Sequence, residues 1–166
     1  MQTLSHMEKL YECPFLPHKA RGTSFAILIH MKESKKCNYI LLVEDDEVIR
    51  RYMSEVLVEE GYRVETASNG KLALQYLKTC QPGDLPSCII LDLMMPIMTG
   101  IEFLNAIQDE HDQWANIPVL VATAKGSSGD QLIGVPLNVG RIQKPMDIEE
   151  FLSAVMERCG EPVNAS

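Results

Sequence analysis

The stretch Tyr39-Ile-Leu-Leu-Val-Glu-Asp-Asp-Glu-Val48 joins an apolar run to four consecutive acidic residues. An uninterrupted apolar run is typical of a strand that is buried on both faces of a parallel sheet. The acidic residues follow at the point where this strand would end. Carboxylates that are held close together repel each other, and each resists ionisation beside the others. A cation must therefore offset their charge, or some of them must point into water.

The four acids alone leave two interpretations open. Acidic side chains are favoured in the first turn of a helix, where the helix dipole is positive and free N–H groups need acceptors. Asp45 or Asp46 could therefore cap the helix that follows. Alternatively, the carboxylates could bind a metal ion.

Apolar runs and helical patterns alternate from Asn38 onward. The predicted strands are Ile40–Val43, Tyr62–Thr66, Cys88–Leu91, Ile117–Val121 and Val139–Gln143. Helical patterns separate these strands, although residues 126–136 carry little pattern of any kind. Strands that alternate with helices form parallel sheets through right-handed crossovers. We therefore predict an α/β fold with a doubly wound, flavodoxin-like, five-stranded parallel sheet that has helices on both faces.

Capping residues set the limits of the predicted helices. Ser68 precedes the second helical pattern and is its expected cap, and Thr99 and Glu102 have capping-box spacing ahead of the third. Asp147 is placed to start the last helix, and Gly160 to end it. In that last helix we expect five apolar side chains to face inward: Ile148, Phe151, Leu152, Val155 and Met156.

The composition is that of an ordinary globular domain, with 46% apolar residues in a chain of 166. Residues 1–36 carry six Lys or Arg and three Asp or Glu, whereas residues 37–166 carry nine and twenty. An acidic main domain argues against nucleic acid as a partner, because phosphates attract Lys and Arg. No apolar run is long enough to cross a membrane, and the first residues lack the layout of a signal peptide. We therefore expect a cytoplasmic protein without a membrane partner.

The five cysteines are scattered along the chain, and none has the spacing of a metal site. This usage is typical of a reducing compartment. Cys88 and Cys159 lie within apolar patterns and are expected in the core.

The chain divides into three predicted parts. Residues 1–36 form an N-terminal extension that we expect to be poorly ordered, residues 37–160 form the main domain, and residues 161–166 form a short tail. Because residues 1–30 resemble no element of the main domain, we expect them to be dispensable for its stability. The alternative is a docking arm built on the apolar residues 25–29.

The ends of the predicted strands carry the residues that can perform chemistry. In a parallel sheet of this type the site lies beyond the carboxyl ends of the strands. Five side chains follow such ends and should converge there: Glu44, Asp45, Asp92, Thr123 and Lys144. Clustered carboxylates suit a hard cation such as Mg²⁺. Lysine and threonine suit phosphoryl oxygens, and an aspartate can act as a nucleophile toward phosphorus.

Four segments together resemble the receiver domain of two-component response regulators. They are Val43-Glu-Asp-Asp46, Leu91-Asp-Leu-Met-Met-Pro-Ile-Met-Thr-Gly100, Val121-Ala-Thr-Ala124 and Lys144-Pro145. The resemblance covers about residues 38–160, and the segment around Asp92 is its most specific part. The order and spacing of the four segments make a chance agreement improbable.

The resemblance implies a role for each of these residues. Asp92 would be the phosphoacceptor, and Glu44 and Asp45 would bind Mg²⁺ together with Asp92 and the backbone carbonyl of Met94. Asp46 lies one position past this acidic pair and is expected to start the helix.

Two further positions match the family. Thr123 would supply the hydroxyl group that follows the phosphoryl group, and Lys144 would pair with that group. The bond between Lys144 and Pro145 is expected to be cis, because only X-Pro bonds adopt the cis form at low cost.

The implied function is that of a stand-alone response regulator. A histidine kinase or a histidine phosphotransfer protein would donate the phosphoryl group, and a protein output partner, whose identity the sequence does not give, would recognise the phosphorylated form. Such a protein catalyses only its own phosphorylation and dephosphorylation, so we do not expect a conventional enzyme. One alternative is an interaction module that is never phosphorylated. Another is an aspartyl-phosphate phosphatase of the haloacid-dehalogenase type, which would need an acid where Met94 stands.

The sequence departs from the family in two places. An aromatic residue usually lies three positions before the lysine, where this chain has Arg141. The usual Gly-Ala pair ahead of the last strand is replaced by Leu137-Asn-Val-Gly140, and Pro136 should shorten the preceding helix. We expect Arg141 to stay outside, because burial of an unpaired guanidinium costs several kcal/mol. It could then bind a carboxylate of the output partner.

Overall fold

A computed structural model of the chain describes residues 35–110, 112–124 and 139–163. Its main sheet has five parallel strands in the order β3-β2-β4-β5-β6. The strands are β2 (Ile40–Val43), β3 (Val64–Ala67), β4 (Cys88–Asp92), β5 (Val119–Ala124) and β6 (Val139–Lys144). The chain crosses over between β3 and β4, so the strand order reverses next to β2. The predicted doubly wound α/β fold is confirmed.

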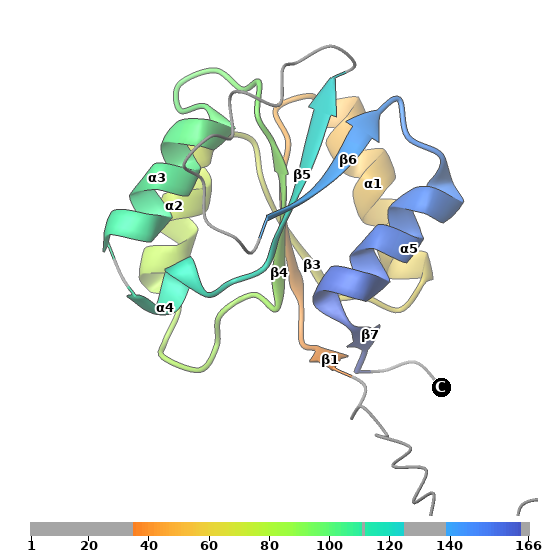
Figure 1. Cartoon of the computed structure of the whole chain (residues 1–166), viewed down its shortest axis with the longest axis horizontal. Coiled ribbons are helices and arrows are strands. Elements are labelled where there is room, and N and C mark those ends of the chain that lie inside the picture. Colours follow the sequence, from red (N-terminus) through yellow and green to blue (C-terminus); the bar gives the residue numbers. More distant parts are fainter. Residues whose placement is uncertain (1–34, 111, 125–138, 164–166) are drawn as a thin grey trace, which may run out of the picture. The chain divides into compact units, whose positions relative to one another are not determined.

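Helices cover both faces of this sheet (Figure 1). The helices α1 (Glu47–Glu59) and α5 (Ile148–Cys159) lie on one face. The other face is covered by α2 (Gly70–Thr79), α3 (Gly100–Glu110) and the short α4 (Asp112–Ala115). The sheet therefore separates two apolar cores, and each strand of its centre contributes to both.

Strand β2 shows why the opening apolar run is continuous. Leu41 and Val43 pack into the core beneath α2 and α3, whereas Ile40 and Leu42 pack into the core beneath α1 and α5. All four side chains are at most 1% exposed. Successive strand residues point to opposite faces, so a strand covered on both faces needs apolar residues at every position.

A second, two-stranded parallel sheet joins the two ends of the described chain. In it, β1 (Lys36–Cys37) pairs with β7 (Glu161–Pro162). The pair includes Lys36 on one side and extends to Pro162 on the other, just outside the predicted limits of 37 and 160, which stay a prediction. Strands of two residues leave no periodic pattern in a sequence. Residues 1–34, for which we expected poor order, and residues 164–166 of the tail lie outside the described residues.

The caps agree with expectation at two helices and differ at a third. Asp147 caps α5, and Thr99 and Glu102 form the predicted capping box before α3. The cap of α2 is Asn69 rather than Ser68, because the Asn69 side chain accepts a hydrogen bond from the Leu72 N–H at 3.0 Å. Both residue types cap helices well, so two neighbouring candidates cannot be separated by pattern alone. The weakly patterned residues 126–136 lie outside the described residues.

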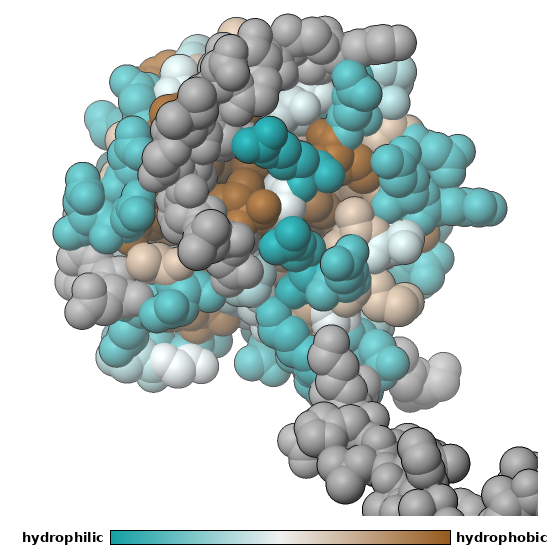
Figure 2. Space-filling view, in the orientation of Figure 1, coloured by the Kyte–Doolittle hydropathy of each residue, from teal (hydrophilic) through white to brown (hydrophobic). Residues whose placement is uncertain are grey.

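The predicted inward face of α5 is partly wrong. Phe151 and Val155 are buried in the core, but Ile148 is 43% exposed and Met156 is 56% exposed. Both residues lie outside the buried stripe of α5, which consists of Phe151, Val155 and Cys159. In the view of Figure 2, hydrophilic side chains cover most of the surface, and hydrophobic side chains gather near strands β5 and β6. No helix of the described part is long and apolar enough to span a membrane.

Candidate phosphoryl-acceptor site

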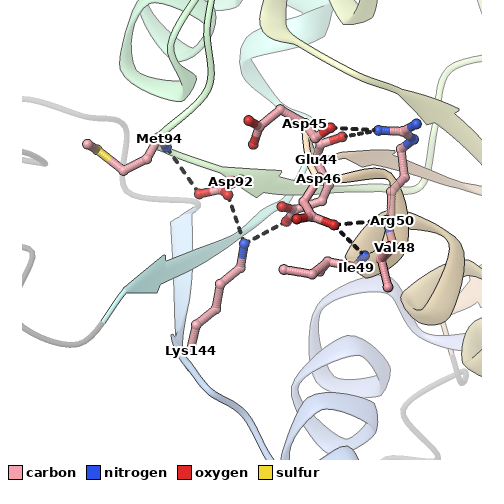
Figure 3. A network of polar contacts seen from close by, with 9 residues as sticks. All are labelled: Glu44, Asp45, Asp46, Val48, Ile49, Arg50, Asp92, Met94 and Lys144. Carbon is pink, nitrogen blue, oxygen red and sulfur yellow. Dashed lines mark hydrogen bonds and ion pairs between the residues drawn. The ribbon is translucent and has the colours of Figure 1, made fainter.

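The carboxyl ends of the sheet strands place the predicted site residues on one edge of the domain. Glu44 and Asp45 directly follow β2, and Asp92 is the last residue of the neighbouring strand β4. Lys144 ends β6 and reaches across to both strands (Figure 3). This is the position where the strand order reverses, at which open α/β sheets bind their ligands.

Lys144 connects the two acidic strand ends. Its Nζ donates to Glu44 Oε2 at 2.6 Å and to Asp92 Oδ2 at 2.8 Å. The Glu44 residue is 2% exposed and Asp92 is 8% exposed. A buried carboxylate of this kind needs a hydrogen-bonded positive partner, and Lys144 supplies one to both.

Burial and charge act against each other in this group. Burial raises the pKa of Glu44, although the hydrogen bond and the charge of Lys144 act to lower it. Burial alone would lower the pKa of Lys144, but the hydrogen bonds and charges of Asp92 and Glu44 together raise it. Lys144 is therefore held in its charged form, ready to bind an anion at the strand ends.

Three carboxylates at this edge could hold a metal ion. One oxygen each from Glu44, Asp45 and Asp92 lies within 4.8 Å of the others. Oxygen ligands without nitrogen or sulfur fit Mg²⁺, which keeps several waters and needs few carboxylates. Met94 lies in the loop that follows, and its N–H donates to Asp92 Oδ1 at 3.1 Å. The donor set therefore fits the predicted ion.

The two interpretations of the opening acidic run apply to different residues. Asp46 caps α1, because its Oδ1 accepts hydrogen bonds from the Val48 and Ile49 N–H groups at 2.8 and 3.0 Å. Glu44 and Asp45 instead belong to the carboxylate cluster. The acids are thus divided between a helix cap and a candidate metal site.

Arg50 is a residue of this edge that sequence reasoning missed. Its Nη1 donates to the backbone carbonyls of Glu44 at 2.8 Å and Asp45 at 3.1 Å, as Figure 3 shows. It therefore fixes the backbone that carries two of the three carboxylates. Its partners are backbone carbonyls, which every residue has, so its spacing alone gave no specific signal.

Thr123 lies one residue past Ala122, which pairs with Asp92 across β4 and β5. Its side chain is half-buried and makes no hydrogen bond with another described residue. The structure thus places Thr123 on the strand beside Asp92 but does not join it to the hydrogen-bonded group.

The loop after Asp92 is closed tightly. The Gly100 N–H donates to the Leu93 carbonyl at 3.0 Å, and a Cβ atom at Gly100 would lie 2.4 Å from the Asp92 carbonyl oxygen. Only glycine fits so close an approach of two backbone segments. The Lys144–Pro145 bond is cis, as predicted.

Comparison with known families agrees with this geometry. Residues 40–156 match the model of the response regulator receiver domain. The chain belongs to this family. Its described sheet, its acidic cluster and its cis Lys144–Pro145 bond are therefore those of a receiver domain in two-component signalling.

Two relatives are transcriptional regulators by name. The CpxR homolog of Haemophilus influenzae, a transcriptional regulatory protein, is 35% identical over 129 residues, which cover 75% of this chain and 53% of that protein. The probable transcriptional regulator ycf29 of Porphyra purpurea is 38% identical over 117 residues, covering 70% and 54%. The chain thus spans about half the length of these relatives.

A solved structure matches the receiver domain almost end to end. The chemotaxis protein CheY4 of Vibrio cholerae aligns with a TM-score of 0.62 and 29% identity, and covers 75% of this chain and 98% of its own. The receiver fold is therefore shared with a protein that is little larger than one such domain.

Proposed function

We propose that Asp92 accepts a phosphoryl group from a phosphohistidine in a Mg²⁺-dependent reaction, and that a protein partner recognises the phosphorylated domain. The observation that carries this proposal is the Lys144 bridge from Asp92 to Glu44, beside the third carboxylate of Asp45. Membership of the receiver family supports it. The donor would be a histidine kinase or a histidine phosphotransfer protein.

The chemistry needs a nucleophile and compensation of negative charge. An Asp92 carboxylate oxygen forms a bond to phosphorus while the bond from phosphorus to the histidine nitrogen breaks, and the electron pair stays on the imidazole. Lys144 can then exchange its bond to Asp92 Oδ2 for one to a phosphoryl oxygen, since its ammonium has three donors. A bound Mg²⁺ would neutralise phosphoryl charge, held by Glu44, Asp45, Asp92 and the Met94 carbonyl.

Thr123 would act after the transfer. Its hydroxyl group, which has no described partner, can donate to a phosphoryl oxygen on the neighbouring strand. A shift of Thr123 toward the phosphoryl group would couple the new charge to a change of surface that a partner can recognise. Arg141 on β6 is exposed, as expected for an unpaired guanidinium, and its contact with an output partner stays a prediction.

The reaction ends when water attacks the aspartyl phosphate and releases inorganic phosphate. We propose that the domain catalyses only two reactions, both on its own Asp92. They are the transfer of the phosphoryl group to this side chain and its later removal by hydrolysis. A dedicated phosphatase of the haloacid-dehalogenase type would need a general acid two residues later, and a thioether at Met94 cannot move a proton.

Replacement of the nucleophile tests the proposal. With a small phosphodonor such as acetyl phosphate and Mg²⁺, we expect one phosphoryl group on the wild-type chain and none on Asp92→Asn, because an amide is not a nucleophile. Intact-mass spectrometry measures the addition. Asp46→Asn is the matched control, because it removes an acid at the same edge while asparagine still caps α1.

Two results of this labelling experiment would contradict the proposal. Equal labelling of Asp92→Asn and the wild type would place the phosphoryl group elsewhere and refute the assignment. If the wild type shows no labelling with or without Mg²⁺, the interaction module that is never phosphorylated becomes the better explanation. Action as a stand-alone regulator stays a prediction, since the named relatives are about twice as long. The intact mass of the protein isolated from its source would test it.

A further inference from the structure

Exposed apolar side chains are concentrated around the acidic site. Among the described residues, the three most exposed large hydrophobic side chains are Val48 and Ile97, at 77% each, and Met94, at 64%. Val48 lies in the first turn of α1, just after the carboxylates of β2, and the other two lie in the loop after Asp92. Scattered surface hydrophobics are normal, but these three all follow closely on the two acidic strand ends and lie on either side of the acids. We call Val48, Met94 and Ile97 the apolar rim.

Ile97 is held in a backbone conformation that is unfavourable for its type. Its φ angle is 72°, and it is the one non-glycine residue with positive φ in the described part of the chain. Branched side chains rarely adopt this region, where glycine and asparagine are favoured. Such strain costs on the order of 1–3 kcal/mol and typically persists where a side chain serves a function. Its 77% exposure shows that packing within the domain does not explain the isoleucine.

The position of Ile97 limits how far it can lie from the site. It is five residues past Asp92 in a loop that the Gly100 N–H closes onto the Leu93 carbonyl, so the loop cannot extend far from the strand end. A stable protein interface covers about 800 Å² on each partner, which corresponds to a patch with a radius of roughly 16 Å. Any protein centred on Asp92 would therefore cover the apolar rim.

The burial of Asp92 limits how a phosphodonor can reach it, and therefore which kind of donor contacts the apolar rim. Asp92 is only 8% exposed, so a donor atom can approach its carboxylate from the open edge alone. A phosphohistidine that is carried on a protein must bring that protein's surface against the loop and the first turn of α1. A small phosphodonor needs no such contact. A protein donor is therefore expected to contact the apolar rim, whereas a small phosphodonor is not.

We propose that Ile97 is a specificity-determining contact for the phosphohistidine-bearing protein, and that its strained backbone is retained because its side chain must be presented on the apolar rim. This inference rests on the proposed function of Asp92. It assigns Ile97 to recognition of the protein donor and not to the chemistry of transfer.

The test compares two donors on the same variants. Ile97→Asn removes the apolar side chain and suits the positive φ angle, so it should fold and raise the melting temperature by a few degrees. The protein donor is a purified, autophosphorylated histidine kinase core that labels the wild-type chain, and the small donor is acetyl phosphate. We expect transfer from the kinase core to slow at least about tenfold, as loss of one important interface side chain does. Labelling by acetyl phosphate should stay within about twofold of the wild type.

Two control variants distinguish the effect of losing an apolar side chain from the effect of its position on the surface. Ile97→Val keeps a branched apolar group and should retain transfer from the kinase core. Val58→Ala removes another exposed apolar side chain, 55% exposed at the far end of α1, and should leave both donors unaffected. Unchanged transfer from the kinase core to Ile97→Asn would overturn the inference, as would an equal loss with acetyl phosphate. Failure of the wild type to label with acetyl phosphate would instead refute the proposed function.

Discussion

At the scale of single residues, Lys144 binds two of the three carboxylates that could hold a divalent cation. Lys144 occupies Glu44 Oε2 and Asp92 Oδ2, and these two residues also belong to the carboxylate cluster. Its ammonium keeps a buried carboxylate paired when no cation is bound. Without it, Glu44 would lie beside Asp92 with no positive side chain of the described residues in hydrogen-bond contact, at a cost of about 1–3 kcal/mol.

We therefore expect Lys144→Ala to lower the free energy of unfolding by about 1–3 kcal/mol in the absence of divalent cations. Millimolar Mg²⁺ should recover part of this loss, because a ligand that binds only the folded state stabilises it. The stabilisation by Mg²⁺ should be larger in the variant than in the wild type, since the oxygens are free. Urea unfolding with and without Mg²⁺ measures both effects.

A surface lysine provides the control for this comparison. Lys71 is exposed on α2, and Lys71→Ala should change neither the stability nor its response to Mg²⁺. Equal stabilisation of the wild type and Lys144→Ala by Mg²⁺ would show that the cation does not use the oxygens that Lys144 occupies.

Residue patterns predicted which side chains of the candidate site lie together, because strand ends place them. Glu44, Asp45, Asp92 and Lys144 each follow an apolar run, and the topology of a parallel sheet brings such ends together. Arg50 escaped prediction because it contacts backbone carbonyls, which any sequence would offer. Thr123 was expected past a strand end at Val121 but lies within β5, which continues to Ala124, and its role stays a prediction.

At the scale of elements, capping decides where α3 begins. The Thr99 N–H donates to Glu102 Oε2 at 2.8 Å, its hydroxyl donates to the same oxygen at 2.8 Å, and the Glu102 N–H donates to that hydroxyl at 3.2 Å. The hydrogen bonds from Thr99, first from its backbone and then from its hydroxyl, lower the pKa of Glu102. The charged form of this side chain is therefore the one that supports the helix start.

The sign of the pH dependence follows from this lowered pKa. A carboxyl group whose pKa is lower in the folded chain adds stability above its ordinary value of 4.5, and the contribution is lost as the pH falls through the folded value. We expect Glu102→Gln to be less stable than the wild type at neutral pH, with a gap that narrows as the pH falls below 4.5 and through the lowered pKa of the folded chain. Thermal unfolding across pH 3–7 would measure it. A gap that is constant with pH would mean that the charge of Glu102 does not support the cap.

The strands and helices differ in how well the sequence pattern predicted them. Continuous apolar runs predicted the three central strands β2, β4 and β5, because a strand buried on both faces is apolar at successive positions. The outer strands β3 and β6 were predicted from weaker patterns, and their side chains are only partly buried. Ile148 and Met156 were placed inside because periodicity marks a stripe but not its width. The four-residue α4 left no signal, although it carries the buried Trp114.

At the scale of the whole domain, the pair β1–β7 joins the start of the described chain to its end. The Glu161 N–H donates to the Lys35 carbonyl at 2.9 Å, and the Tyr62 hydroxyl donates to the Gly160 carbonyl at 2.9 Å. Cys37, on β1, is 2% exposed in the core beneath α1 and α5. These contacts close the domain at the end of the sheet opposite to the site, and no sequence pattern revealed them.

Gly160 is the residue on which this closure depends. Its φ angle is 89°, and a Cβ atom there would lie 1.9 Å from the Lys35 carbonyl oxygen. Gly160→Ala must therefore strain its own backbone and also push Lys35 away, which breaks the hydrogen bond to Glu161 and the adjoining β1–β7 pair. Gly83 offers a comparison, because its φ angle is 96° but a Cβ atom there would have no neighbour within 4 Å among the described residues.

We expect Gly83→Ala to cost about 1–2 kcal/mol of unfolding free energy, the cost of positive φ alone. Gly160→Ala should cost about 2–3 kcal/mol more, because contacts of β1 are lost with it. In a chain that starts at Asn38 there is no Lys35 to displace, so the excess cost of Gly160→Ala should largely disappear. Urea unfolding of the two variants in both chain lengths measures this coupling. If the excess persists in the shorter chain, it arises from the backbone of Gly160 itself, and β1–β7 does not close the domain.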